Sequence, residues 1–422
     1  MKVLVIGNGG REDALCRTIA KSSKVKELFC LPGNGGTAKF AVNVAKNPLD
    51  VDEVCAFVAE KAIDLTVIGP EGPLAVGLSD ALRAQGCKVF APSKAAAEIE
   101  SSKELAKKIM LKYNIPTADY QAFSKADEAK AYIKDRSCPI VIKADGLAAG
   151  KGVIVAETKE QANAAISDML ENKAFGIAGS RVVIEEFLAG EEVSILAFID
   201  GEKIVPMVSA QDHKRIFDGD KGPNTGGMGA YSPAPVYTQE IAARVEKEIL
   251  QPIAKALVAE GRYYQGVIYA GLMITADGPK VVEFNARFGD PEAQAVLPRL
   301  DSDLVDIMQA VLDGTLQEQD IKWNEDASVC VVMVSGGYPG SYEKGKLISG
   351  TRLAEEEGAV VYHAGTDLRY GEYFTAGGRV LGVCALGKTI AEAVEAAYKA
   401  VEKIEFDGQY YRKDIAYRAL NR

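Results

Sequence analysis

The first hundred residues alternate short apolar runs with segments whose apolar positions recur every three or four residues. The runs KVLVI, LFCLP, DLTVIGP and CKVFAPS have the length and composition of strands, whereas REDALCRTIAKS and PLAVGLSDALRAQG have a helical period. Such alternation is typical of a doubly wound, parallel βα sheet. We therefore predict an N-terminal α/β domain over residues 1–100.

The pattern changes after this domain. The segment SSKELAKKIMLKYNIP begins with a capping box, Ser101 with Glu104, and a helix there has to end before Pro116. This predicts that a second domain begins near residue 101.

The rest of the chain divides into three predicted units. Strands and a helix of the C-terminal unit are expected at SVCVVMVSGG, AVVYHAG and GRVLGVCALG and over residues 389–404. The predicted units are a central domain at 101–119 and 191–325, a small α/β unit at 120–190 and a C-terminal α+β domain at 326–422.

Composition limits the possible partners. The net charge of -10 argues against a nucleic-acid or anionic-membrane surface but permits a local cationic pocket. The seven cysteines are scattered and include no CxxC pair, so they indicate neither a disulfide framework nor a zinc site. Because no signal peptide or long apolar stretch is recognisable, we expect a cytoplasmic protein without membrane contact. The oligomeric state stays open, with a monomer slightly favoured.

The stretch VIKADGLAAGKG places glycines and lysines between two β-branched runs. A P-loop needs four residues between its glycines, whereas three separate Gly146 from Gly150, and Gly152 follows Lys151 where Ser or Thr belongs. With a strand on each side, this loop is predicted to be a hairpin whose amides cover phosphates while Lys143 or Lys151 supplies charge. The alternative is a glycine-rich hairpin that binds nothing.

The segment GNGGRE follows the first strand and opens a helix, a context that favours anion binding. A dinucleotide fingerprint needs glycine or alanine where Glu12 stands and an acidic residue at the end of the second strand. A nicotinamide or flavin cofactor is therefore disfavoured. A phosphorylated substrate on the amides of Asn8, Gly9 and Gly10 is favoured, with a βα turn that binds nothing as the alternative.

The segment at 209–233, SAQDHKRIFDGDKGPNTGGMGAYSP, contains five glycines between 219 and 229, which predicts an irregular loop. Asp212 and Lys214 are among its charges of both signs, so the loop suits a zwitterionic ligand. A disordered surface loop is the alternative. His213 is either a ligand contact or a histidine satisfied by backbone.

The segment VVEFNARFGDPEAQ predicts a metal site. Alternation along a strand places Glu283 and Asn285 on one face, with Val282 and Phe284 on the other. One carboxylate and one amide oxygen are what a Mg²⁺ ion shared with nucleotide phosphates takes from a protein. Arg287 can form paired hydrogen bonds to a phosphate or carboxylate. A salt-bridged strand end is the alternative.

Together these stretches resemble the glycinamide ribonucleotide synthetase family, also called phosphoribosylamine–glycine ligase, of the ATP-grasp superfamily. The resemblance runs nearly end to end, and GDKGPNTGGMGAYSP and RFGDPEAQ are its most specific motifs. It implies an α/β ATP-grasp fold in which residues 120–190 form a small mobile lid. The family usually has histidine after GGRE, where this chain has Asp13. We expect Asp13 to point away from the pocket, because a carboxylate there would repel a phosphate.

The resemblance also implies an activity. An enzyme of this family ligates glycine to 5-phosphoribosylamine in purine biosynthesis, with ATP as the third substrate and Mg²⁺ or Mn²⁺ as the metal. A glycyl phosphate forms on the way to glycinamide ribonucleotide, ADP and phosphate. No enzyme nucleophile is required, in agreement with a chain that has two histidines and no G-x-S-x-G motif. The alternatives are an ATP-grasp ligase for another acid or amine and a non-catalytic nucleotide-binding regulator.

Site residues follow from the resemblance position by position. The metal ligands are expected to be Glu283 and Asn285, and the catalytic residues Arg287, Asp212 and Lys214. ATP is expected to contact Lys103, Lys143, Gly146, Gly150, Lys151, Gly152, Glu185, Phe187, Leu188 and Glu192. Within that set, Glu185, Phe187 and Leu188 match the adenine edge and Glu192 the ribose. The other substrates are expected to contact Asn8, Gly9, Gly10, Glu71, Asp212, Lys214, Arg287, Gly289 and Asp290.

Overall fold

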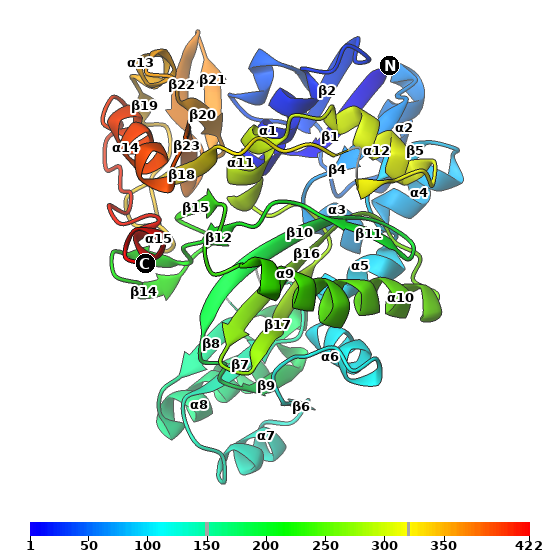
Figure 1. The fold of residues 1–422 in the computed structure, drawn as a ribbon, viewed down its shortest axis with the longest axis vertical. Coiled ribbons are helices and arrows are strands. Elements are labelled where there is room, and N and C mark those ends of the chain that lie inside the picture. The colour runs from blue at the N-terminus through cyan, green and yellow to red at the C-terminus, as the bar shows by residue number, and fades with distance from the viewer. Residues whose placement is uncertain (148–151, 319–320) are drawn as a thin grey trace.

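A computed structural model describes residues 1–147, 152–318 and 321–422 of the chain. Figure 1 shows the N-terminal and C-terminal parts side by side at the top, a central sheet beneath them and a small α/β unit at the bottom. The ATP-grasp fold implied by the resemblance is confirmed. The mobility of the small unit, called the lid below, stays a prediction.

The N-terminal sheet is parallel throughout, as predicted, with the order β3-β2-β1-β4-β5. Its strands are β1 (Lys2–Gly7), β2 (Glu27–Pro32), β3 (Val42–Asn43), β4 (Leu65–Ile68) and β5 (Lys88–Phe90). Its helices are α1 (Gly10–Ile19), η1 (Thr37–Lys39), α2 (Val51–Lys61), α3 (Glu71–Ala75) and α4 (Leu78–Ala84). The single helix predicted from PLAVGLSDALRAQG is wrong, because Gly77 adopts φ +88° and separates α3 from α4.

The junction with the central domain lies between two helices, α5 (Lys94–Ser101) and α6 (Lys103–Lys112). The predicted capping box at Ser101 is wrong by one residue. Ser102 is extended, and its side chain accepts a hydrogen bond from the Leu105 amide, whereas Ser101 is the last residue of α5. Two helices therefore meet at a single extended residue.

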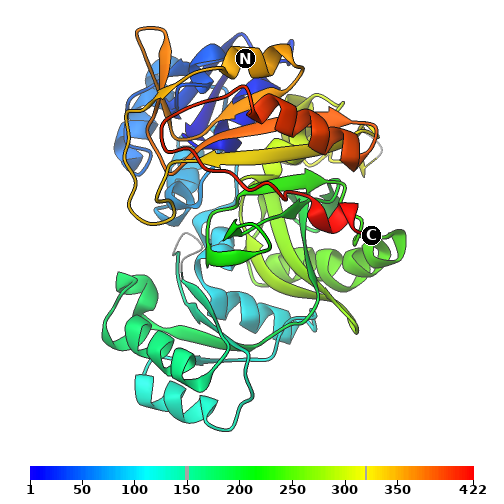
Figure 2. The ribbon, with the colours of Figure 1, turned by 90° about the vertical axis from the view of Figure 1, so that its left-hand side faces the viewer.

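The lid is a four-stranded antiparallel sheet, β6-β9-β7-β8, with helices packed on it. It comprises β6 (Tyr120–Phe123), α7 (Ala126–Ile133), β7 (Ile140–Ala144), β8 (Val153–Ala156), α8 (Lys159–Ile166), η2 (Ser167–Glu171), η3 (Gly176–Ser180) and β9 (Val182–Glu186). The predicted hairpin is confirmed by the pairing of Lys143 with Val153. Gly150 and Lys151 lie outside the described residues. Figure 2 shows the lid projecting below the rest of the molecule.

The central sheet is antiparallel, with the order β11-β10-β16-β17. Its strands are β10 (Glu191–Asp200), β11 (Lys203–Pro206), β16 (Gln265–Thr275) and β17 (Gly278–Asn285), and the helices α9 (Gln239–Val245), η4 (Glu246–Leu250) and α10 (Gln251–Ala259) run beside it. After β17 follow α11 (Glu292–Val296), η5 (Leu297–Arg299) and α12 (Leu304–Leu312).

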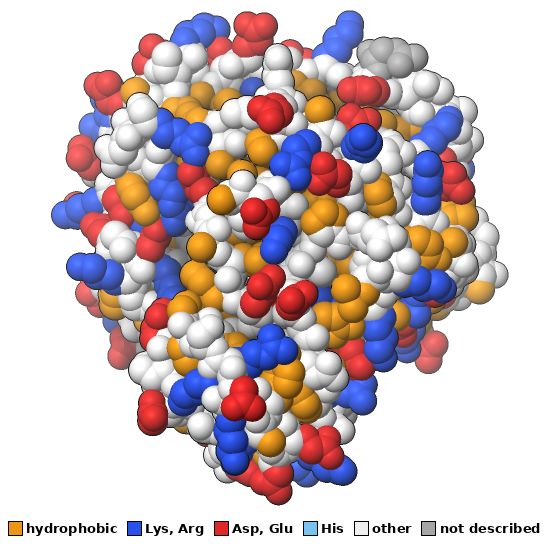
Figure 3. Space-filling view, turned by 60° about the horizontal axis from the view of Figure 1, so that its bottom comes forward, with side chains coloured by type: hydrophobic (Ala, Val, Ile, Leu, Met, Phe, Trp, Pro, Cys, Tyr) orange, Lys and Arg blue, Asp and Glu red, His pale blue; other side chains and the backbone are white. Residues whose placement is uncertain are grey.

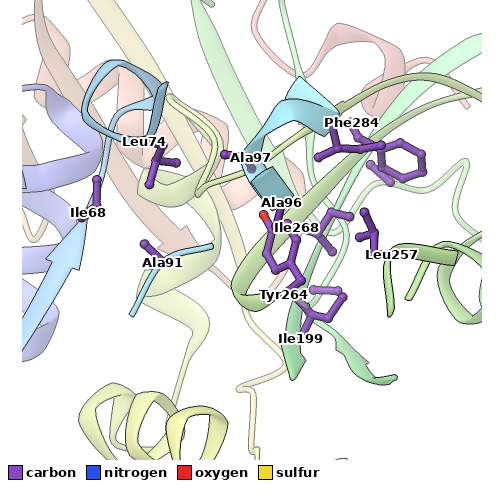
Figure 4. Close-up of a cluster of buried hydrophobic side chains, with 14 of the residues drawn as sticks. Ile68, Leu74, Ala91, Ala96, Ala97, Ile199, Leu257, Tyr264, Ile268 and Phe284 are labelled. Atoms are coloured by element: carbon purple, nitrogen blue, oxygen red, sulfur yellow. The ribbon is translucent and has the colours of Figure 1, made fainter. Parts of the chain in front are cut away.

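A shared hydrophobic core joins the N-terminal and central parts. Figure 4 shows Ala96 and Ala97 of α5 beside Tyr264, Ile268 and Phe284 of the central part. All five side chains are buried in one continuous cluster. The N-terminal part and the central sheet are therefore packed as one body.

The C-terminal sheet extends across the predicted domain boundary at 326. Its order is β12-β15-β18-β23-β20, and its first two strands come from the central segment. The prediction that 209–233 is irregular is wrong, because this segment forms β12 (Gln211–Asp212), β13 (Arg215–Phe217), β14 (Lys221–Asn224) and β15 (Gly229–Ser232). Gly219, Gly226 and Gly227 lie between strands, whereas Gly222 lies within β14 and Gly229 begins β15. The φ angle is positive at Gly219, Gly222 and Gly227.

The remaining C-terminal elements complete this domain. They are β18 (Ala327–Val334), β19 (Leu347–Ile348), α13 (Thr351–Glu356), β20 (Val360–His363), β21 (Thr366–Arg369), β22 (Glu372–Thr375), β23 (Arg379–Gly387), α14 (Ile390–Val401) and α15 (Tyr417–Leu420). The helix expected over 389–404 corresponds to α14, which the Thr389 side chain caps.

Neither positive nor negative charge dominates the face of the molecule at the lid end. Figure 3 shows basic and acidic side chains interspersed over that face. Within the described parts of the chain, no helix has both the length and the apolar character needed to cross a bilayer.

Candidate active site

Two adjoining cavities lie between the lid and the central sheet, with volumes of about 330 and 340 Å³. The first, here called the inner cavity, reaches the N-terminal part at Arg11 and Glu71. The second, the outer cavity, is bordered by the apolar side chains of Val155, Phe187 and Met273. The walls of both include Lys143, Glu185, Asp212, Lys214 and Glu283. These volumes are in the range of small-molecule sites.

Glu283 stands where the two cavities meet, near the end of β17. The Asn285 side chain hydrogen-bonds to the Glu283 carboxylate, which confirms that the two side chains share a face of the strand. Phe284 points into the core instead and is 2% exposed. Burial opposes ionisation of Glu283, but the positive charges of Lys214 and Lys143, together with that of a third lysine, hold its pKa below the usual value. The carboxylate is thus anionic at neutral pH.

The third lysine is Lys103, the first residue of α6, and it contacts the lid hairpin. Its ammonium donates to the Gly146 carbonyl at 2.9 Å, and Lys143 donates to the Val282 carbonyl of β17 at 3.0 Å. Burial lowers the pKa of Lys103, and Glu283 opposes that shift. Two lysines therefore connect the lid hairpin and the central sheet beside the shared carboxylate.

Lys107 belongs to the same wall, although it was not among the predicted site residues. It is 2% exposed and lies one helical turn after Lys103. Its ammonium donates to Thr117 at 2.8 Å and lies 3.2 Å from Glu185, which also pairs with Lys143 at 3.0 Å. Burial lowers the pKa of Lys107 to about 8, against the opposing effect of Glu185. The i,i+4 spacing from Lys103 was the available signal.

Glu185 and its neighbours form one border of the outer cavity. One Glu185 carboxylate oxygen contacts both lysines, whereas the other is buried with no hydrogen-bond partner among the described residues. Phe187, which is 43% exposed, and Leu188 line the cavity beside it. The structure therefore gathers the residues expected near the adenine into one partly apolar wall.

A second group of charges surrounds Lys214. It forms ion pairs with Glu192 and, at 3.4 Å, with Asp212. Burial opposes its charge, but Asp212, Glu192 and Glu283 raise the pKa of Lys214 well above the usual value. Burial, by contrast, raises the pKa of both Glu192 and Asp212, with Lys214 acting in the opposite direction. Lys214 is consequently a permanent cation in the floor of the cleft.

Arg287 is held between two carboxylates in the inner cavity. It contacts Glu71 of α3 and Glu100 of α5 at 2.9 Å each. Burial opposes its charge, but these carboxylates raise the pKa of Arg287 further. Glu100 also accepts the Ala286 amide at 2.7 Å. Sequence reasoning found Glu71 and Arg287 but missed Glu100, which no motif marks.

The residues after Arg287 bring three domains together. A β-carbon at Gly289 would meet the Glu292 carboxylate at 2.3 Å, so a larger residue there would displace the Glu292 side chain. Asp290 accepts the Arg11 amide at 3.3 Å and pairs with Arg379 of the C-terminal domain at 3.2 Å. Both Glu292 and Arg379 line the inner cavity and were not predicted.

The predicted phosphate cradle at Asn8, Gly9 and Gly10 lies beside the inner cavity and is not part of its wall. The Gly9 amide donates to the Glu12 carboxylate at 2.6 Å, and Asn8 is exposed. The next residue, Arg11, does reach the cavity. A ligand phosphate on these amides would have to displace Glu12.

Two buried residues are oriented away from the cleft. Asp13, in the first turn of α1, accepts the His363 amide at 2.8 Å and faces the C-terminal domain, as expected. His213 is fully buried, and its Nε2 accepts the Ala416 amide at 2.9 Å. Of the two alternatives for His213, the structure supports a histidine satisfied by backbone.

Models of phosphoribosylglycinamide synthetase domains match consecutive parts of the chain. The N domain matches residues 1–100, the ATP-grasp (A) domain 101–293 and the C domain 328–418. The chain belongs to the phosphoribosylglycinamide synthetase family. Two relatives, both named phosphoribosylamine–glycine ligase, extend this match over the whole chain. The relative from Halalkalibacterium halodurans is 54% identical, and the match covers 100% of this chain and 97% of the relative. The relative from Vibrio cholerae is 50% identical, and the match covers 100% of this chain and 99% of the relative.

Solved structures agree with membership of the phosphoribosylglycinamide synthetase family. A phosphoribosylamine–glycine ligase of Thermotoga maritima has a TM-score of 0.87 at 34% identity and covers 99% of this chain and 100% of its own. A biotin carboxylase of Campylobacter jejuni has a TM-score of 0.74 at 16% identity, with 100% and 95% covered. The second likeness shows the common fold alone.

Proposed function

We propose that this enzyme is an ATP-dependent ligase that joins glycine to 5-phosphoribosylamine in purine biosynthesis. The observation that carries this proposal is the pair of cavities joined at Glu283, Lys143 and Lys214. The outer cavity offers partly apolar walls for a nucleotide base, and the inner cavity offers charges of both signs for polar substrates. Family membership over the full chain supports this choice over a ligase for another acid or amine.

ATP is proposed to lie in the outer cavity with its phosphates directed towards the junction. Phe187 and Leu188 would flank the base, and Glu192 the ribose. Lys103 and Lys143, which now bind backbone carbonyls, would transfer their hydrogen bonds to phosphate oxygens. The described glycines Gly146 and Gly152 border the inner cavity, and Gly150 and Lys151 complete the expected loop.

A divalent cation fits the shared wall. The anionic Glu283 carboxylate and the adjacent Asn285 amide give one charged and one neutral oxygen, the donors that Mg²⁺ and Mn²⁺ take when ATP phosphates supply the others. When bound, the ion would offset negative charge on the phosphates during transfer. ATP-grasp enzymes use divalent metals generally, and either ion remains compatible with this donor pair.

The inner cavity is proposed to hold glycine and 5-phosphoribosylamine. A glycine carboxylate oxygen attacks the γ-phosphorus of ATP, giving glycyl phosphate and ADP. The amine of 5-phosphoribosylamine then attacks the glycyl carbonyl, loses a proton and displaces phosphate. Lys214 and Arg287 supply fixed positive charge near the acyl phosphate, and Asp212 can accept an ammonium hydrogen bond. Glu71 and Asp290, in the wall of this cavity, and the adjacent Gly289 are proposed to border these substrates. Asn8, Gly9 and Gly10 are proposed to bind a substrate phosphate beyond this wall, with Glu12 displaced.

The test is phosphate release from ATP by the purified protein. Release should require both glycine and 5-phosphoribosylamine, and glycinamide ribonucleotide should form in equal amount. Lys103→Met should lower kcat/KM at least ~10-fold, because a fixed charge at the phosphates is lost. Lys108→Met is the matched control, since Lys108 is on the same helix with a side chain 62% exposed. Equal turnover without glycine, or with another acid in its place, would contradict the proposal.

A further inference from the structure

The last residues of the chain hold the segment that carries Asp212 and Lys214. Both views of the fold show α15 and the C-terminus beside the β13–β14 hairpin (Figures 1 and 2). This hairpin directly follows Lys214 and borders the outer cavity through Arg215 and Asp220. The C-terminal segment, residues 412–422, thus lies against this wall of the outer cavity and contributes Arg418 to it.

Asp220 is the centre of the contact. It adopts φ +54° at the turn between β13 and β14. Its carboxylate accepts hydrogen bonds from Arg412 at 2.9 Å, from Tyr417 at 2.6 Å and from Arg418. The Arg412 side chain is fully buried, which is rare for an arginine unless it is paired. Three donors within seven residues of the terminal segment therefore converge on one carboxylate.

Neighbouring residues reinforce the same contact. The Gly219 amide donates to Asp414 at 2.8 Å, and the Lys413 amide donates to Asp218 at 2.9 Å. Arg412 binds Asp414 through two hydrogen bonds of 2.7 and 2.8 Å. Every residue of the turn 218–220 thus binds the terminal segment.

The contact continues to the site through His213. Its Nε2 accepts the Ala416 amide at 2.9 Å, so its Nδ1 carries the hydrogen and lies 4.0 Å from Asp220. His213 stands between Asp212 and Lys214, the residues shared by both cavities. The terminal segment therefore contacts the residue that directly joins Asp212 to Lys214 in the chain.

We propose that residues 412–418 are a positioning element of the active site, which acts through Asp220 and His213 to orient Asp212 and Lys214. This inference rests on the proposed function for its effect on turnover. It assigns Asp220, Arg412 and Tyr417 as positioning residues, which act through other side chains. The C-terminal domain therefore contributes to catalysis and does more than support the fold.

The test is Asp220→Asn, which keeps the shape of the side chain and removes its charge. We expect kcat/KM for glycine to fall about tenfold or more and hydrogen exchange of amides 211–216 to accelerate, because the turn loses its charged acceptor. Asp220→Glu should restore part of both. Lys413→Met is the matched control, since Lys413 is in the same segment and contacts the turn through its backbone amide, with its side chain exposed. It should change neither quantity.

Tyr417→Phe removes a single hydroxyl and keeps the test valid if Asp220→Asn fails to fold. It should accelerate exchange at 211–216 and lower kcat/KM a fewfold, in the same direction as Asp220→Asn. Wild-type kcat/KM in folded Asp220→Asn, or unchanged exchange at 211–216 in both variants, overturns the inference. The exchange measurement needs no substrate. It therefore tests the positioning role of residues 412–418 even if glycine-dependent turnover, and with it the proposed function, fails.

Discussion

The lid and the N-terminal part are both joined to the central sheet, but by different forces. Two large clusters of buried apolar side chains run from the N-terminal sheet into the central part. The lid has a separate core of its own, and its contacts to the body include polar pairs such as Lys280 with Glu186 and Arg181 with Glu104. Continuous apolar burial resists separation, whereas partly exposed ion pairs contribute little. The buried Lys107–Glu185 pair also joins the lid to the body.

The two walls of the cleft belong to parts of the molecule that are held in different ways. Glu283, Asn285 and Arg287 stand on the packed body, where their positions relative to Glu71 and Glu100 are held by buried core. The glycine hairpin stands on the lid. A site that must admit a nucleotide and then exclude water benefits from one rigid and one movable wall.

The largest expected effect compares one deletion in each core. Leu257 of α10 and Ile166 of α8 are both fully buried. Leu257→Ala should lower the free energy of unfolding of the N-terminal and central parts together by about 2–5 kcal/mol. Ile166→Ala should destabilise the lid by a similar amount and leave the body protected. Denaturation followed by hydrogen exchange in each part measures both, and common destabilisation of all parts by Ile166→Ala contradicts the separation.

A second prediction concerns Asp13, which joins the N-terminal part to the C-terminal domain. Burial raises its pKa to about 6, against the lowering effect of the His363 amide. Its protonated form is favoured in the folded state, so its contribution to stability is present at low pH and is lost as pH rises through about 6. At pH 8, Asp13→Asn should be more stable than wild type by up to about 3 kcal/mol, and near pH 4 by little.

Denaturant unfolding of both proteins between pH 4 and pH 8 measures this difference. Asp135→Asn changes an exposed carboxylate of the lid and is the control, with an expected effect within about 0.5 kcal/mol at each pH. A stability difference for Asp13→Asn that does not vary with pH would show that Asp13 titrates normally.

A smaller effect is expected on lid motion. Binding of a non-hydrolysable ATP analogue should slow hydrogen exchange in β7 and β8 about tenfold, because the lid closes on the nucleotide. Strand β20, in the C-terminal domain, should not change. Equal exchange of β7 and β8 with and without the analogue would contradict closure of the lid on the nucleotide.

Sequence patterns predicted most of this architecture because local periodicity decides strands and helices that pack on neighbouring elements. The strands at 211–232 were missed because they pair with each other and with β18, about a hundred residues later. Glycine content indicated turns there but not the pairing between them. The cap of α6 is Ser102 and not the predicted Ser101, because Ser101 is the last residue of α5. Only the tertiary structure shows where α5 ends.

The site residues that lie in a sequence motif were predictable, whereas those that only the tertiary fold brings to the cavities were not. Glu283, Asn285 and Arg287 lie in one motif and face the same cleft. Lys107, Glu100 and Arg418 reach the cavities from other elements, and an isolated charged residue in a sequence usually lies in solvent. Their positions in the cavity walls depend on contacts far away along the chain.

The most direct test of this account is ligase turnover against Mg²⁺ concentration for wild type and Glu283→Gln. Loss of the one carboxylate proposed to bind the metal should lower kcat at least ~10²-fold and weaken apparent metal affinity, with folding nearly unchanged. Glu128→Gln, which changes an exposed lid carboxylate that lines neither cavity, should keep near-normal turnover. Near-normal turnover of Glu283→Gln at ordinary Mg²⁺ would contradict the assignment and leave the proposed metal site without its carboxylate.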